Sequence, residues 1–128
     1  MSPMPGSSAS IELLVTEADT AIAHRSGEVP VLATPRLIAL CEQAACTAIA
    51  ADLSSGQTTV SMKVQIDHIA PSAIGQTVTA EATVEKVQGR RIGFTVSVHD
   101  DHGLIAAGRV TRVIVDAAEF LAKAQHSD

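Results

Sequence analysis

Three ionisable residues interrupt apolar patterns at positions where an apolar side chain is expected. Glu42 stands at the edge of an apolar helical stripe, His68 ends an alternating segment on its inward side, and Arg112 lies among small and apolar residues. A carboxylate and an imidazole in one enclosed site can divide the work of hydrolysis, the first attacking a carbonyl or activating water and the second moving protons. A hydrolytic site is therefore one interpretation of this pattern.

Each of these residues also has a purely structural interpretation. A carboxylate at the edge of a helical stripe commonly pairs with a cation, a histidine at a strand end is often a satisfied structural residue, and Arg112 can simply neutralise Glu42. Thr34 joins the group by position, because the N–H groups of a helix N-terminus can steady an oxyanion, although a threonine there is by itself expected only to cap the helix. Periodicity alone does not choose between these interpretations.

The stretch that positions Glu42 is ATPRLIALCEQAACTAIAADL, residues 33–53, and its period predicts a long buried helix. Thr34-Pro35 is a good helix start, since the hydroxyl can cap free N–H groups and proline fits the first turn. A lone acid beside a buried stripe is costly unless it finds a partner. The apolar side of this helix is predicted to hold Leu37, Ile38, Cys41, Ala45, Ala48 and Ile49.

Alternating segments predict five strands, over residues 11–15, 59–68, 77–84, 92–98 and 104–115. In the second of these, the parity places Thr59 and Ser61 outward and His68 inward, together with Val60, Met62, Val64 and Ile66. The last strand is apolar on both faces and is therefore predicted to be central. A short helix over 117–124 is expected to close the chain, anchored by Phe120 and Leu121.

This order, a strand, a long helix and then four strands in an antiparallel meander, predicts an α+β fold with one long helix packed across a curved antiparallel five-strand sheet. A length of 128 residues suits one domain. We place that domain over residues 11–124, with a disordered tail over 1–10 and a short tail over 125–128.

Composition excludes several classes of function. The formal net charge of −5, with no basic run, argues against a nucleic-acid partner, and the helix is interrupted too often by charge to span a membrane. Cys41 and Cys46 lie on different sides of one helix and cannot bridge, so we expect a reducing, cytoplasmic location. The cluster His99-Asp100-Asp101-His102 fills a turn, and we expect neither a metal nor a cofactor.

The four singled-out residues have a spacing that resembles the hotdog-fold thioesterases, and within them the fluoroacetyl-CoA thioesterase-like group. That group has a Thr opening the long helix, a Glu eight residues later, a His ending the next strand before Ala-Pro, and an Arg in the last strand. The matching residues are Thr34, Glu42 in LIALCEQAA, His68 in IDHIAPSAIGQTV and Arg112 in AAGRVTRVIV. The resemblance covers about residues 11–121.

The resemblance implies a hotdog fold, a homodimer formed through the sheets, and an acyl-CoA thioester bound at the subunit interface. It implies that Thr34, Glu42 and His68 are catalytic. Our hypothesis is that Glu42 acts as nucleophile or general base and His68 as acid/base, with Arg112 as a supporting residue. Substrate binding is assigned to Ser61, Arg90 and Arg91, the arginines as cations for CoA phosphates.

The expected activity is hydrolysis of a short or medium acyl thioester. The segment HRSGEVPVLA has no aromatic residue to form a bulky lid over a very small acyl group, so the sequence does not identify the acyl group of the substrate. Two other functions fit the same residues. A hotdog hydratase or dehydratase would use Glu42 and His68 on a proton next to the carbonyl, and a non-catalytic module would bind acyl-CoA without turnover.

Overall fold

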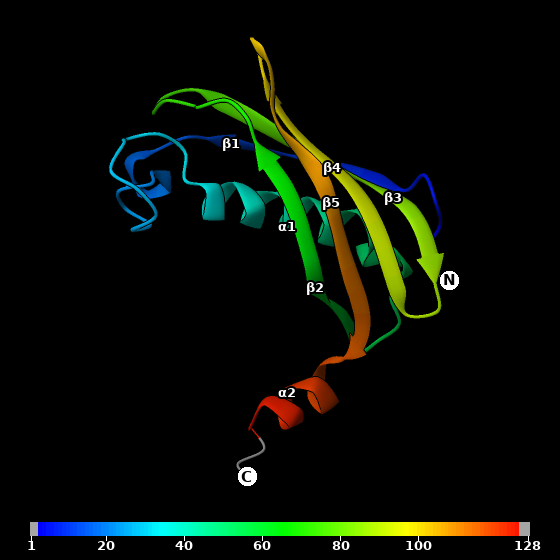
Figure 1. Cartoon of the computed structure of the whole chain (residues 1–128). Coiled ribbons are helices and arrows are strands. Elements are labelled where there is room, and N and C mark those ends of the chain that lie inside the picture. The colour runs from blue at the N-terminus through cyan, green and yellow to red at the C-terminus, as the bar shows by residue number, and fades with distance from the viewer. Residues whose placement is uncertain (1–2, 126–128) are drawn as a thin grey trace.

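One long helix lies across a curved five-stranded antiparallel sheet in the computed structural model, which describes residues 3–125 (Figure 1). The predicted α+β fold class is confirmed, and short 3₁₀ turns follow β1 and α1. The elements are β1 (Ser8–Leu14), α1 (Thr34–Ile49), β2 (Gln57–His68), β3 (Thr77–Gln88), β4 (Arg91–Asp100), β5 (Gly103–Asp116) and α2 (Ala117–Gln125).

The strand order is β1-β3-β4-β5-β2, so the predicted four-strand meander is wrong for β2. Only β3, β4 and β5 form a meander, while β2 lies at the edge of the sheet and pairs with β5. Alternation of side chains fixes which face of a strand is buried but does not name its neighbour. The last strand, β5, is interior as its composition indicates, although the middle strand is β4.

The sheet begins earlier than predicted. Ser8 opens β1, and before it the N–H of Gly6 donates to the carbonyl of Val84 at 2.8 Å, while the N–H of Val84 donates to the carbonyl of Ser7 at 2.8 Å. The disordered tail predicted over 1–10 is therefore wrong for this part of the chain. Residues 1–2 and 126–128, which belong to the predicted tails, lie outside the described residues.

The hydrophobic core fills the space between α1 and the sheet. Phe94 is buried at its centre, and alanines on α1 and β3 let the helix approach the strands closely. Most of the predicted helix stripe is confirmed, with Leu40 and Ala44 added and Ile38 only partly buried. The core residues of the helix and its facing strands include Leu37, Leu40, Cys41, Ala44, Ala45, Ile49, Val78, Ala80, Ala82, Val84, Ile92, Phe94, Val98 and Val110.

A β-bulge in β2 changes which side chains face the helix. The register against β5 shifts between Ser61 and Lys63, so Met62 is the extra residue and is 51% exposed. Thr59, predicted outward, is buried with 6% exposure, and Ser61 also faces α1. Beyond the bulge the predicted parity holds and His68 faces the helix. A single extra residue reverses the parity of all side chains before it, which alternation does not reveal.

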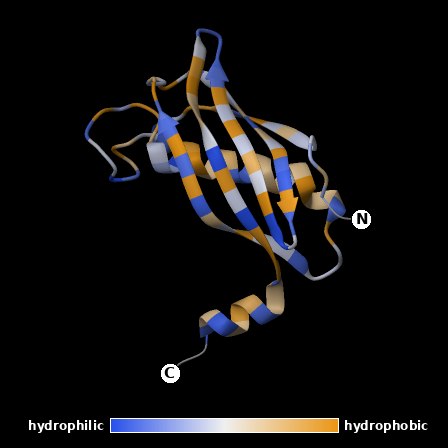
Figure 2. Cartoon of the chain, turned by 45° about the vertical axis from the view of Figure 1, so that its right-hand side comes forward, coloured by the Kyte–Doolittle hydropathy of each residue, from blue (hydrophilic) through white to orange (hydrophobic). Residues whose placement is uncertain are grey.

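The C-terminal helix α2 forms as predicted but does not dock on the sheet. Its two expected anchors are exposed, Phe120 at 43% and Leu121 at 57%, and none of its residues is buried. The helix projects from the end of β5 (Figure 1), and Figure 2 shows hydrophobic and hydrophilic residues interleaved along it. Within residues 3–125, no helix is both long and apolar enough to cross a membrane.

Candidate active site

The N-terminus of α1 places the Thr34 hydroxyl against an imidazole. Thr34 is the first helical residue, Ala33 is the N-cap, and no side chain caps the helix, so the predicted capping role of Thr34 is wrong. Its Oγ1 lies 2.8 Å from Nδ1 of His68, at the end of β2. The hydroxyl can donate to a bare Nδ1 or accept from a protonated one. Either bond orients the imidazole ring.

The other ring nitrogen of His68, Nε2, is buried and has no hydrogen-bond partner among the described residues. Burial lowers the pKa of His68 below its ordinary value, and the nearby backbone of Ala70 opposes this shift without cancelling it. The ring is therefore neutral at pH 7. A buried nitrogen without a partner is unusual in a folded protein, and a ligand that fills the site is one physical reason for it.

Thr34 and His68 line a cavity of about 330 Å³. Its walls come from the loop before α1 and from the residues that follow β2. Most of them are small or apolar, and Glu28 is the one carboxylate among the lining residues. A mainly apolar cavity next to a few polar groups has the character of a small-molecule site. The remaining lining residues are Ala21, Ser26, Gly27, Val29, Val31, Leu32, Ile69, Ala70 and Pro71.

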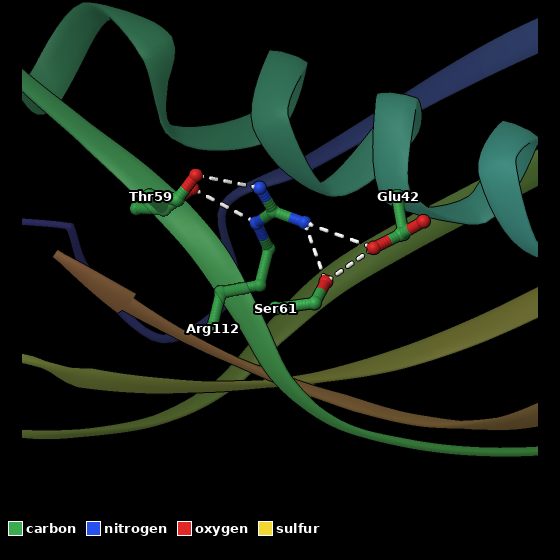
Figure 3. Close-up of polar contacts among 4 residues, drawn as sticks. All are labelled: Glu42, Thr59, Ser61 and Arg112. Atoms are coloured by element: carbon green, nitrogen blue, oxygen red, sulfur yellow. Dashed lines mark hydrogen bonds and ion pairs between the residues drawn. The ribbon is translucent and has the colours of Figure 1, made fainter. Parts of the chain in front are cut away.

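A second polar group surrounds Glu42 in the middle of α1 (Figure 3). Nη1 of Arg112 lies 3.5 Å from Oε2 of Glu42 and donates to Oγ of Ser61 at 2.7 Å, and that hydroxyl donates to the same carboxylate oxygen at 2.5 Å. The guanidinium also donates to Oγ1 and to the carbonyl of Thr59, at 2.8 and 2.7 Å. The carboxylate is thus held through one oxygen, and no hydrogen bond of the described residues uses its Oε1.

Exposure differs across this ion pair. The side chain of Arg112 is 8% exposed and that of Glu42 is 34% exposed. The buried guanidinium is compensated by several oxygens, as a desolvated charge requires, while the carboxylate keeps access to its surroundings. Thr59 was missed from the sequence because parity placed it outward. Once Arg112 is recognised as buried, the hydroxyls on the neighbouring strand become its natural acceptors.

Glu42 and His68 do not contact each other in one chain. Thr34 and Glu42 lie on the same helix eight residues apart, which separates them by about 12 Å along the axis at 1.5 Å per residue. The structure therefore brings together Thr34 with His68, and Glu42 with Ser61 and Arg112, as two groups between α1 and β2.

Comparisons with known proteins identify the family. A family model described as fluoroacetyl-CoA-specific thioesterase matches residues 15–118. The chain belongs to this family. It is 33% identical over 93 residues to the fluoroacetyl-CoA thioesterase of Streptantibioticus cattleyicolor, covering 73% of this chain and 67% of that protein. The resemblance predicted from the four spaced residues is thereby confirmed.

Solved structures agree with this membership. The fluoroacetyl-CoA thioesterase FlK superposes with a TM-score of 0.90 at 27% identity, over 98% of this chain and 97% of that one. A variant of FlK in complex with acetyl-CoA gives a TM-score of 0.89 at 26% identity, over 95% and 96% of the two chains. A Thermus thermophilus protein described as a thioesterase superfamily member gives 0.88 at 28%, over 96% and 91%. The hotdog fold and the thioester hydrolase class of this family member are therefore shown.

The two predicted phosphate-binding arginines stand away from both polar groups of this thioesterase family member. Arg90 lies in the turn between β3 and β4, and its Nη1 donates to the carbonyl of Ile114 at 3.3 Å. Arg91 alternates with the buried Ile92 and therefore points to the face of the sheet away from α1. Neither residue lines the cavity beside His68. Their substrate-binding role therefore stays a prediction.

The loop in front of α1 is fixed by an ion pair that was not predicted from the sequence. Arg36 Nε lies 3.0 Å from Oδ1 of Asp19, whose other oxygen accepts hydrogen bonds from the N–H and hydroxyl of Thr16. Burial opposes ionisation of Asp19, yet these hydrogen bonds and the guanidinium together lower its pKa. The carbonyl of Asp19 also accepts from the N–H of Ala33, the N-cap of α1. The cavity wall is thus tied to the helix that carries Thr34.

The turn after β4 has a structural explanation. Oδ1 of Asp100 accepts from the N–H groups of His102 and Gly103, at 2.8 and 3.1 Å. Such a bond pattern stabilises a tight turn without any ion. Among residues 3–125, no three His, Cys, Asp or Glu side chains gather as a metal site.

Proposed function

We propose that two copies of this chain form a homodimer that hydrolyses a short or medium acyl-CoA thioester in a reducing, cytoplasmic compartment. Glu42 acts as nucleophile or general base, His68 as the acid/base partner, and Thr34 orients the imidazole. The observation that carries the proposal is the Thr34–His68 pair beside the cavity, with Nε2 of His68 buried and without a partner. CoA binding by the related FlK, and two free cysteines here, support the substrate and the compartment.

The chemistry can follow either of two balanced routes. In the first, a Glu42 oxygen attacks the thioester carbonyl and the carbon–sulfur bond breaks, which releases CoA as the thiolate. Neutral His68 then takes a proton from the water that hydrolyses the acyl-enzyme anhydride, and passes this proton to the CoA sulfur. In the second, Glu42 removes a proton from a water molecule that attacks the carbonyl directly, the carbon–sulfur bond breaks, and His68 passes the proton from Glu42 to the CoA sulfur. Oε1 of Glu42, which accepts no hydrogen bond from residues 3–125, suits both routes, and Arg112 with Ser61 keeps the carboxylate in place.

A second copy is needed because Glu42 and His68 are separated within one chain. The edge strand β2 carries His68 and Ser61, and its outer side pairs with no other strand of residues 3–125. Two such edges can pair antiparallel around a twofold axis, the commonest symmetry of homo-oligomers. A row of unpaired N–H and C=O groups is a ready template for this pairing.

The charged residues on β2 favour one register for this pairing. With Gln65 on the twofold axis, Lys63 of each copy lies directly opposite Asp67 of the other, and Val64 lies opposite Ile66. Opposite charges facing each other across strands stabilise the pair by about 0.2–1 kcal/mol each. In the same register His68 meets the bulge at Ser61 and Met62 of the second copy, because two bulged residues oppose one. Since Ser61 holds Glu42, this pairing brings the carboxylate to the imidazole of the other subunit.

Thiol release from acyl-CoA substrates tests the activity. Hydrolysis of acetyl-, butyryl- and hexanoyl-CoA by the full chain should release free CoA, and Glu42→Gln or His68→Asn should each lower kcat about 10²–10⁴-fold. The exposed Glu12→Gln and His99→Asn variants are matched controls and should keep wild-type rates. Ligand-induced thermal stabilisation without thiol release would identify a binding module instead, and hydration of an enoyl-CoA without thiol release would identify a hydratase.

Mixing the two inactive variants tests the shared site. A heterodimer of Glu42→Gln and His68→Asn chains has one site with both changes and one site with neither. Since half of randomly mixed dimers are heterodimers, activity should return to about a quarter of the wild-type value. If Glu42 and His68 act within one subunit, every site in the mixture carries one change and no activity returns.

A further inference from the structure

The helix α2 presents an apolar face that no other part of residues 3–125 covers. Residues spaced three and four apart place Ala117, Phe120, Leu121 and Ala124 on one side of the helix, opposite Glu119 and Lys123. Phe120 and Leu121 are 43% and 57% exposed, although Phe120 is one of only two aromatic residues in the sequence. Large apolar side chains grouped on a projecting helix are a feature of interaction surfaces.

The position of α2 places the helix at the edge of the sheet where the proposed second copy pairs. The helix starts where β5 ends, and the N–H of Ala117 donates to the carbonyl of Gly56 at 2.9 Å, just before β2 begins. From there it extends to the side of the sheet on which β2 has its free edge, as both Figure 1 and Figure 2 show. In an antiparallel β2 pair, the beginning of one β2 lies beside the end of the other.

The surface that the second copy presents at this level is apolar as well. Its β2 ends at His68, and the residues that follow include Ile69 and Ile74, which are 63% and 50% exposed. Ile69 also lines the cavity next to His68. In the register that places Lys63 opposite Asp67, the apolar residues on α2 of one copy therefore lie next to the apolar residues that follow β2 of the other copy.

We propose that α2 of each copy packs its Phe120 and Leu121 against Ile69 and Ile74 of the other copy and forms part of the wall of that copy's acyl cavity. This proposal rests on the homodimer described above and adds a part of the substrate site that a single chain lacks. The ligand in contact with this wall is the acyl chain of the thioester. Longer acyl chains gain more binding free energy from such a wall, since each buried methylene adds to the apolar contact.

Cross-linking between two different chains tests the contact directly. In a Cys46→Ser background, which removes the exposed thiol, Leu121→Cys chains and Ile69→Cys chains are co-expressed and oxidised. We expect a disulfide-linked heterodimer, because side chains in contact meet the distance that a disulfide requires. The matched control replaces Leu121→Cys by Lys123→Cys, on the opposite side of the same helix, and should give no heterodimer.

Kinetics test the role in the acyl site. The double variant Phe120→Ser with Leu121→Ser should raise KM for hexanoyl-CoA about tenfold while KM for acetyl-CoA changes about twofold or less. The control variant Glu119→Ser with Lys123→Ser should change neither value. If both pairs of substitutions leave the chain-length profile unchanged, α2 is not part of the acyl site.

The two proposals can fail separately. If mixing Glu42→Gln and His68→Asn chains restores activity but Leu121→Cys and Ile69→Cys do not cross-link, the shared active site stands and the position proposed for α2 is wrong. If mixing restores nothing and wild-type sedimentation shows a monomer, the homodimer is wrong and the contact of α2 with a second copy falls with it.

Discussion

The two polar groups between α1 and β2 are built in opposite ways. Around Glu42, a buried guanidinium uses its donors on Thr59, Ser61 and the carboxylate. At His68, one hydrogen bond with Thr34 orients the ring, and the second nitrogen has no partner within the described residues. The first group fixes a charge in place, and the second leaves a proton-transfer atom available beside a cavity.

This difference suits a division of roles in hydrolysis. A carboxylate that attacks or activates water works best when its position is set before substrate arrives, since no reorganisation is then needed during reaction. An acid/base group needs a nitrogen that can exchange a proton with the substrate. Each prediction below perturbs one side of this contrast, beginning with the group that carries more hydrogen bonds.

Arg112→Met should have the largest effect on stability. The substitution keeps an apolar side chain of similar length but leaves Thr59 and Ser61 without their buried donor and Glu42 without its cation. Because Glu42 is 34% exposed, the main cost comes from the two oxygens of buried Thr59 that lose their donor, and we expect a loss of about 1–3 kcal/mol for each of them in the free energy of unfolding. Chemical denaturation of the variant and the wild type measures it.

The control for this prediction is Arg109→Met on the same strand. Arg109 is 69% exposed and its only ion pair among residues 3–125, with Glu85, spans 3.5 Å at the surface. Its replacement should change the free energy of unfolding by about 0.5 kcal/mol or less. Equal losses of unfolding free energy for the two arginine variants would show that the hydrogen bonds of Arg112 do not stabilise the group around Glu42.

Gly108→Ala should have an intermediate effect on stability, because it pushes β5 away from β2, the strand that contributes Ser61 and His68 to the two groups. Gly108 of β5 lies opposite Ile66, between Ser61 and His68 on β2. A Cβ at this position would overlap the carbonyl oxygen of Gln65 and lie 2.7 Å from the Cα of Ile66, so the backbone of β2 must move. We expect a loss of about 1–3 kcal/mol in the free energy of unfolding.

Gly93→Ala is the matched control for this substitution. Its Cβ would meet the flexible side chain of Lys86 at 3.4 Å, which can move aside. The free energy of unfolding should therefore change by less than about 1 kcal/mol. If Gly108→Ala is tolerated equally well, the close approach of β2 to β5 does not set the positions of the two groups.

The sequence predicts the fold class and the ionisable residues of both groups, because an ionisable side chain that breaks an apolar period is visible in the period itself. It does not predict their separation. The bulge at Met62 adds one residue without changing the alternation that follows, so Thr59 is assigned to the wrong face. The edge position of β2 depends on long-range pairing, and that edge decides whether Glu42 meets His68 in one chain or across two.

The smallest effect is expected on the proton affinity of His68, and it tests whether the two groups meet in the dimer. Within one chain, burial lowers the pKa of His68, so the neutral base persists at pH 7 and kcat/KM should fall only as the pH drops below the ordinary histidine value of about 6.5.

In the composite site the carboxylate of Glu42 from the other copy favours the imidazolium and counteracts this lowering. Glu42→Gln removes that charge, and the pKa of His68, followed by NMR titration of its ring protons, should therefore be lower in the variant than in the wild type. The Glu12→Gln variant should leave the titration unchanged. A wild-type pKa identical to that of Glu42→Gln would mean that the two side chains stay apart in the dimer as they do in the single chain.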